Sequence, residues 1–166
     1  MTGVDASHEM LAVARAALPD VELREGALTA LPFDDATFDL AVCALALTHL
    51  PELGGAIAEL ARVIRPGGRL IVSDFHPAMA LIGGSALFFD SAGRAGYVTS
   101  HHHPHGSYLR AFRDAGLEVL DCVEPVIGPE HVKMASAGMS KLAPEAFQMA
   151  LVGWPEALVW ELARRP

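Results

Sequence analysis

Carboxylates and histidines that follow apolar runs are the residues of this chain best suited to chemistry. Asp5 comes directly after the run Thr2–Val4. An acidic side chain just past a strand of an α/β sheet can accept hydrogen bonds from both hydroxyls of a ribose. His49 and His76 each follow a longer apolar run and could serve as general bases. Nucleotide binding with proton transfer is therefore the chemistry that these residue types suggest.

A histidine cluster also invites a metal interpretation. It consists of His101, His102, His103 and His105. Neutral imidazoles bind zinc or nickel. However, adjacent residues point in different directions, no cysteine or acidic residue stands nearby in the sequence, and catalytic zinc sites combine their ligands with fixed supporting partners. We expect no metal site and favour a polar loop with one histidine facing a substrate. A metal-binding module built on this loop is the lesser alternative.

These residues need a scaffold, and the pattern of the chain predicts one. Apolar strand-like runs alternate with helical patterns, which is typical of a mostly parallel α/β sheet. The run at 38–44 is apolar almost throughout, which fits a strand covered on both faces. Strands are expected at 1–5, 21–25, 38–44, 70–75, 117–123 and 157–163, and helices after Ser7, from Pro51, from Ser107 and at 143–151.

Two stretches lack a clear pattern. Residues 77–106 are of mixed character and contain several glycines together with the histidine cluster. A segment this long with little structure of its own is usually a lid or a substrate loop. Residues 125–138 are a second, weaker candidate for such a loop.

Composition narrows the class of protein. The 166 residues are 52% hydrophobic and 19% charged, which predicts one folded domain spanning 1–166. The net charge of −8 argues against nucleic acid and membrane partners, since both need a basic face. The N-terminus lacks the pattern of a signal peptide. Cys43 and Cys122 cannot build a disulfide framework, so we expect a cytoplasmic protein.

Three motifs follow Asp5 in a fixed order. They are Arg24–Leu28, then Leu31–Phe33 leading into Phe38–Val42, and then Ile64–Leu70 with its Pro-Gly-Gly. Each is weak alone. Together, at these spacings, they resemble the class I S-adenosylmethionine-dependent methyltransferases, in particular the small-molecule type-11 group. The resemblance is strong from residue 3 to about 76 and returns from 107 to 123.

The resemblance implies a fold, a cofactor and a reaction. The fold would be a Rossmann-like, mostly parallel sheet with an antiparallel C-terminal strand. The reaction would be in-line transfer of a methyl group from S-adenosylmethionine to a small molecule held under the lid segment 77–106. No nucleic acid or membrane partner is expected, and a homodimer is one of the ways in which open sheet edges could be paired. The implied cofactor-binding residues are Asp5, Ala6, Ala27, Leu28 and Ala44. His49 would be the catalytic base, and His76, His103 and His105 would contact the substrate.

The chain departs from the family pattern in two places. Ala27 stands where the family carries an acidic residue, and one lost neutral hydrogen bond costs roughly 0.5–1.5 kcal/mol. The family's first strand, glycine-rich loop and first helix precede the residue that matches Asp5, and only four residues do so here. We expect an N-terminally truncated domain without its first βα unit. The two sheet edges beside the missing strand must then close, pair with another chain or stay open.

Other functions stay in competition with methyl transfer. A methyltransferase-like remnant could bind a partner or cofactor without doing chemistry, and this chain alone could be inactive. Half of a nicotinamide dehydrogenase would also place an acid after its second strand. It would need a glycine fingerprint about twenty residues earlier, and no such sequence precedes Asp5.

Overall fold

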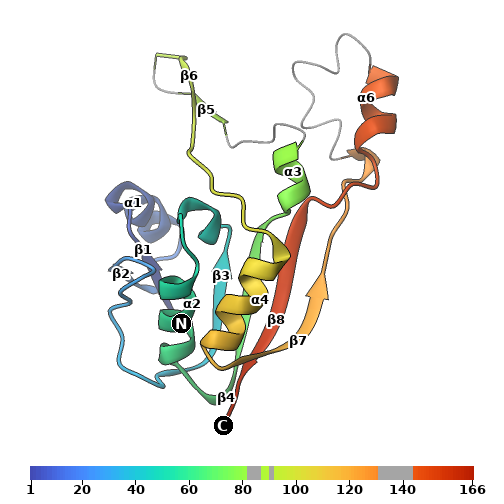
Figure 1. The fold of residues 1–166 in the computed structure, drawn as a ribbon. Coiled ribbons are helices and arrows are strands. Elements are labelled where there is room, and N and C mark those ends of the chain that lie inside the picture. Colours follow the sequence, from blue (N-terminus) through green and yellow to red (C-terminus); the bar gives the residue numbers. More distant parts are fainter. Residues whose placement is uncertain (82–86, 90–91, 131–143) are drawn as a thin grey trace.

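The computed structural model describes residues 1–81, 87–89, 92–130 and 144–166 (Figure 1). Each predicted strand and helix is present, with ends shifted by a few residues. The helix expected from Pro51 begins at Gly54, and the one expected from Ser107 begins at His105. The elements are β1 Thr2–Asp5, α1 His8–Ala17, β2 Glu22–Glu25, β3 Phe38–Ala44, the short 3₁₀ helix η1 Leu47–His49, α2 Gly54–Val63, β4 Ile64–Phe75, α3 Pro77–Leu81, β5 Leu87–Phe89, β6 Ala95–Tyr97, α4 His105–Asp114, β7 Leu117–Val123, α6 Pro144–Leu151 and β8 Ala157–Arg164.

The main sheet has four strands in the order β3-β4-β8-β7. β3 and β4 run parallel, and Val42 lies beside Ile71. β8 is antiparallel to both of its neighbours. This confirms the predicted Rossmann-like α/β class, a mostly parallel sheet with an antiparallel C-terminal strand.

β1 and β2 form a separate parallel pair. Among the described residues, β1 is paired only with β2, and the edge of β3 opposite β4 has no strand beside it. The two edges predicted to flank a missing strand therefore do not close on each other. A hollow of about 560 Å³ lies near the start of both strands, with Thr2 and Phe38 in its lining.

The core lies between the four-stranded sheet and two helices, α2 and α4, which cover one face of the sheet (Figure 1). Leu70 and Val72 of β4 are fully buried there. Ile57 from α2 and Phe112 from α4 pack in the same cluster. Burying a side chain of this size contributes about 1.5–3 kcal/mol, so this layer holds the carboxyl ends of the strands in place.

The opposite face of the sheet is open at β3. Leu40 is 57% exposed and Val42 is 65% exposed, and alternation along a strand puts both on one face. The expectation that residues 38–44 are covered on both faces is therefore wrong. The physical reason is that the helices packed on this sheet, α2 and α4, both lie on the other side, where Cys43 is buried.

The Pro-Gly-Gly motif is a bulge rather than a separate turn. β4 begins at Ile64, opposite Phe38, and pairing resumes with Arg69 opposite Leu40. A Cβ on Gly68 would lie 2.8 Å from the carbonyl oxygen of Asp39. Only glycine allows this approach of two backbones, so the motif sets how β4 enters the sheet.

The expected lid segment 77–106 contains more structure than the sequence suggested. It holds α3 and the antiparallel pair β5-β6, which extends beyond the sheet in Figure 1. Its return end is fixed on η1, because the His101 amide donates to the Thr48 carbonyl at 2.7 Å. Of the second loop candidate, residues 131–138 lie outside the described residues. In the part of the chain that the structure describes, no helix has the length and apolarity needed to span a bilayer.

Candidate functional site

Asp5 stands at the carboxyl end of β1 and is exposed. Its Oδ1 accepts a hydrogen bond from the Ser7 amide at 2.8 Å. Ser7 in turn caps α1, since its Oγ accepts from the Met10 amide at 3.2 Å. The Ser7 amide therefore fixes Oδ1 of Asp5, and no hydrogen bond to Oδ2 of Asp5 is seen among the described residues. Ala6, also exposed, lies within this turn.

The loop after β2 lies beside Asp5. The Gly26 amide donates to the Asp5 carbonyl at 3.1 Å. A Cβ on Gly26 would come within 2.8 Å of Pro32, so glycine is required for this packing. Ala27 is exposed, and Leu28 is half-buried against the core. The structure thus brings the predicted residues Asp5, Ala27 and Leu28 to one edge.

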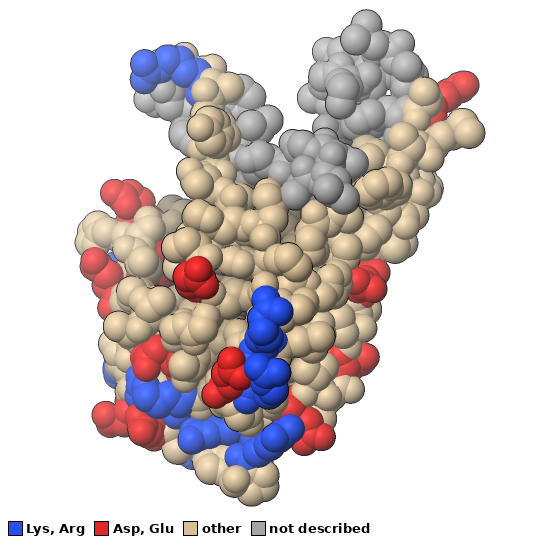
Figure 2. Space-filling view, in the orientation of Figure 1, with Lys and Arg blue, Asp and Glu red and all other residues tan. Residues whose placement is uncertain are grey.

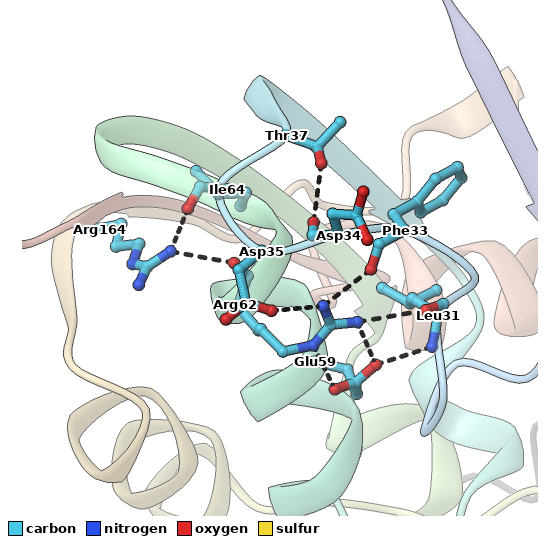
Figure 3. A network of polar contacts seen from close by, with 9 residues as sticks. All are labelled: Leu31, Phe33, Asp34, Asp35, Thr37, Glu59, Arg62, Ile64 and Arg164. Atoms are coloured by element: carbon cyan, nitrogen blue, oxygen red, sulfur yellow. Dashed lines mark hydrogen bonds and ion pairs between the residues drawn. The ribbon is translucent and has the colours of Figure 1, made fainter.

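A polar network holds this loop against α2 (Figure 3). The guanidinium of Arg62 donates to the carbonyl oxygen of Phe33 at 2.8 Å and to that of Leu31 at 3.2 Å. Glu59 receives bonds from Arg62 at 2.7 Å and from the Leu31 amide at 2.8 Å. Its hydrogen bond to Arg62 lowers the pKa of Glu59. Arg164 extends the network from β8 by donating to the carbonyl oxygens of Ile64 and Arg62.

Ala44 ends β3, and a strained residue follows it. Leu45 has φ of 53°, a left-handed conformation that leucine rarely adopts. Its amide donates to the Ser73 carbonyl of β4 at 2.8 Å, which holds the turn. Strained backbone of this kind concentrates at functional sites. The chain therefore turns sharply at the strand end where the sequence predicts a cofactor contact.

His49, predicted as the catalytic base, is exposed at the end of η1. In the described part of the chain its imidazole forms no hydrogen bond or ion pair. His103 lies nearby, with its Nε2 2.9 Å from the carbonyl oxygen of Leu50. One ring nitrogen of His103 is thus used to dock the returning segment on η1.

His76 and His105 are brought together by a residue that the sequence analysis missed. Glu124 follows β7, and its Oε1 lies 3.0 Å from Nε2 of His76 and 2.8 Å from Nε2 of His105. The two rings are in edge contact, with centroids 5.1 Å apart. The hydrogen bonds from His105 and then His76 lower the pKa of Glu124. A charged residue directly after an apolar strand and before Pro125 was the available signal.

A second missed residue, Asp74, stands two positions before His76 and is 1% exposed. The Tyr108 hydroxyl donates to its Oδ2 at 2.7 Å. Burial, followed by this hydrogen bond, raises the pKa of Tyr108. Burial and the charge of Asp74 raise the pKa of Cys43 to about 11, so that thiol stays protonated near neutral pH. The buried pair anchors the start of α4 under the end of β4.

The geometry described above can be compared with known proteins. The family model described as "Methyltransferase domain" matches residues 1–72. A demethylmenaquinone methyltransferase of Renibacterium salmoninarum is 40% identical over 78 residues, which are 46% of this chain and 33% of that protein. The matched region therefore spans about a third of the length of this curated relative.

Solved structures agree with this match. A methyltransferase from Mesorhizobium loti, described as S-adenosylmethionine-dependent, aligns with a TM-score of 0.68 at 24% identity, over 98% of this chain and 80% of that one. Residues 1–72 thus match the methyltransferase family model, and the chain has the fold of solved methyltransferase structures. The resemblance found in the sequence is thereby confirmed over these residues.

The fold by itself does not settle the reaction. The [4+2]-cyclase SpnF aligns with a TM-score of 0.67 at 22% identity, over 99% of this methyltransferase-like chain and 65% of that protein. A shared fold can carry different chemistry, so function has to be argued from the site.

Proposed function

We propose that this chain is a single methyltransferase domain that binds S-adenosylmethionine and transfers its methyl group to a small molecule. The observation that carries the proposal is the family match over residues 1–72, whose predicted nucleotide residues lie together at the ends of β1 and β2. Strand ends of this type bind nucleotides in open α/β sheets.

The donor set at β1 and β2 suits the nucleoside part of the cofactor. The Asp5 carboxylate is exposed and oriented by the Ser7 amide, as ribose hydroxyls require. Half-buried Leu28 offers an apolar surface for an adenine ring. Ala27 gives no side-chain hydrogen bond, so recognition there falls to the backbone. When bound, the cofactor supplies an electrophilic methyl group on a sulfonium.

The acceptor would lie between the strand ends and segment 77–106. In-line transfer depends mainly on holding acceptor and methyl close and aligned, and on excluding water. On the face shown in Figure 2, arginines gather at the lower end, where β8 ends, among acidic side chains. The net charge of −8 argues against a nucleic acid partner and leaves a small molecule as the acceptor we propose. The demethylmenaquinone relative suggests a hydroquinone as the first acceptor class to test.

Calorimetric titration with S-adenosylhomocysteine tests cofactor binding directly. We expect the chain to bind it and Asp5→Asn to weaken the affinity about tenfold to a hundredfold, because a hydrogen bond to a charged group contributes about 1.5–3 kcal/mol. Asp20→Asn is the matched control, since Asp20 is also exposed but lies after α1. Equal affinity of both variants, or no binding by the wild-type chain, would contradict the proposal.

A non-catalytic, partner-binding domain is the second candidate function. The open β3 face with Leu40 and Val42, and the unpaired edges of β1 and β3 among the described residues, favour it. Exposed apolar patches mark interaction surfaces, and a homodimer is one way to cover this one. Absence of S-adenosylhomocysteine binding together with self-association would favour this candidate.

A further inference from the structure

The cluster of His76, His105 and Glu124 is the one group of three histidine and acidic side chains in the described residues whose ligand atoms all lie within 4.8 Å of one another. It is assembled from the ends of β4 and β7 and from the first turn of α4. β4 lies next to β3, which ends at the proposed cofactor residue Ala44, and β7 lies beyond β8 in the same sheet. The cluster could hold a metal ion or handle a proton, and the hydrogen bonds distinguish the two.

The tautomer of His76 is fixed by its neighbours. The Ala78 amide donates to Nδ1 of His76 at 3.1 Å, so Nδ1 must be the unprotonated nitrogen. The proton of the neutral ring is then on Nε2, which donates to Glu124 at 3.0 Å. A metal bound at Nε2 would require the proton on Nδ1, facing the amide proton of Ala78. His76 is 8% exposed, and its backbone amide is also bonded, to the Glu156 carbonyl, which restrains it in this position.

Glu124 also selects the tautomer of His105. Its Oε1 accepts from Nε2 of His105 at 2.8 Å, which leaves Nδ1 as the nitrogen with a free lone pair in the neutral ring. No hydrogen bond to that Nδ1 is present among the described residues. The His105 side chain is 40% exposed, whereas its ring packs edge-on to Trp160 with centroids 6.1 Å apart. The ring is thus held in place with one nitrogen available.

We propose that His105 is the general base that takes the proton from the small molecule being methylated. Glu124 is the positioning residue that fixes the tautomer of His105. This inference rests on the proposed function. The acceptor oxygen attacks the methyl carbon, the carbon–sulfur bond breaks and its electron pair stays on sulfur. The acceptor proton moves to Nδ1 of His105, which becomes an imidazolium beside the Glu124 carboxylate. The proton leaves to solvent after product release. In this proposal His105 takes the role of catalytic base in place of His49, whose imidazole has no carboxylate partner in the described residues.

Imidazole NMR of isotope-labelled protein tests the pairing without any acceptor. We expect neutral His105 and His76 to appear as Nε2–H tautomers, with both Nε2 protons shifted downfield by the bond to carboxylate. Glu124→Leu should abolish both downfield shifts. Glu118→Leu is the matched control, because Glu118 is an exposed glutamate on the same strand. A wild-type Nδ1–H tautomer of His105, or shifts that survive in Glu124→Leu, would overturn the proposal.

Zinc titration tests the metal alternative with the same variants. We expect that the wild-type chain does not bind Zn²⁺ at a site that depends on Glu124, so Glu124→Leu should not change the titration. A stoichiometric Zn²⁺ site that is lost in Glu124→Leu and kept in Glu118→Leu would overturn the proposal in favour of a metal centre.

Turnover supplies a further readout, with hydroquinone, catechol and phenol as probe acceptors. We expect His105→Gln to lower kcat by about a hundredfold and to remove the acidic limb of the pH–rate profile, in which the rate rises as the base loses its proton, with S-adenosylhomocysteine affinity unchanged. Full kcat in His105→Gln would overturn the proposal. If the wild-type chain does not bind S-adenosylhomocysteine, that result would count against the proposed function. The NMR experiment tests the pairing of His105 with Glu124 whether or not the ligand binds.

Discussion

At the scale of single residues, polar side chains in this chain divide into those that support loops and those left available for chemistry. Arg62 donates to the carbonyl oxygens of Leu31 and Phe33, and Glu59 accepts from the Leu31 amide. Asp5 and His105 instead each have one atom fixed by a neighbour and another without a hydrogen bond among the described residues. The second pattern is what a binding or catalytic group needs.

Glu59→Gln should lower Tm by about 5 °C at neutral pH, because it weakens charged hydrogen bonds to Arg62. The hydrogen bond to Arg62 holds the pKa of Glu59 in the folded chain below its ordinary value of 4.5, so its stabilisation is complete above that value. It is lost as the pH falls through the lowered pKa. Thermal melts should therefore show a smaller difference from wild type at about pH 3. Exposed Glu52→Gln is the control, and a Tm difference that does not change with pH would contradict the argument.

At the scale of elements, close contacts between backbones decide where the strands meet. β4 follows α2 without a loop, and the bulge at residues 65–68 corrects its register against β3. Gly68 makes this correction feasible, since its Cα faces the carbonyl oxygens of Asp39 and Arg65. The register in turn sets the positions of Ala44 and Ser73 at the strand ends.

Gly68→Ala should destabilise the fold by about 1–3 kcal/mol, the usual range for overpacking. The added Cβ would lie 2.8 Å and 2.9 Å from two carbonyl oxygens, which cannot move as a flexible side chain could. Urea unfolding measures the change. Gly54→Ala is the matched control, because nothing lies within 4 Å of its Cβ and alanine favours the first turn of α2. Equal midpoints for both variants would show that the bulge tolerates a side chain.

Local patterns predicted most of these elements, and the reasons for the exceptions are physical. Strand-end chemistry placed Asp5 at the end of a strand because that signal is local, whereas Ala27 and Ala44 came from the family resemblance. The grouping of His76, His105 and Glu124 depends on the strand order β4-β8-β7, which brings residues distant in the chain together. The open β3 face was missed because an apolar run does not reveal which faces are covered.

At the scale of the whole molecule, the uncovered face of the four-stranded sheet is the main exposed apolar surface. Leu40 and Val42 lie on it, and alternation along β4 puts Phe75, which is 39% exposed at the end of that strand, on the same face. Each exposed apolar side chain that is buried contributes about 1.5–3 kcal/mol, so contact between two molecules through this face is favourable. The acidic net charge of −8 opposes such contact at long range.

Val42→Lys should reduce self-association, measured as the weight-average mass in sedimentation at rising protein concentration. The lysine ammonium would have to be desolvated at the contact, which is costly. Met149→Lys is the control, because Met149 is 86% exposed on α6, away from this sheet. The expected result is a lower mass for Val42→Lys than for wild type and Met149→Lys. Identical masses for all three would place any association elsewhere.

The separation of β1-β2 from the four-stranded sheet also bears on how the molecule melts. Among the described residues, no strand pairing joins the two sheets, so side-chain packing and the bonds of Arg62 to the intervening loop hold them together. Contacts across such a boundary can open at a lower free energy than the whole fold. Local opening there would separate the residues proposed to contact the ribose from the proposed proton acceptor while the larger sheet stays folded. A bound nucleoside that contacts both sheets would oppose this opening. Ligand binding would therefore reduce backbone mobility most at this boundary.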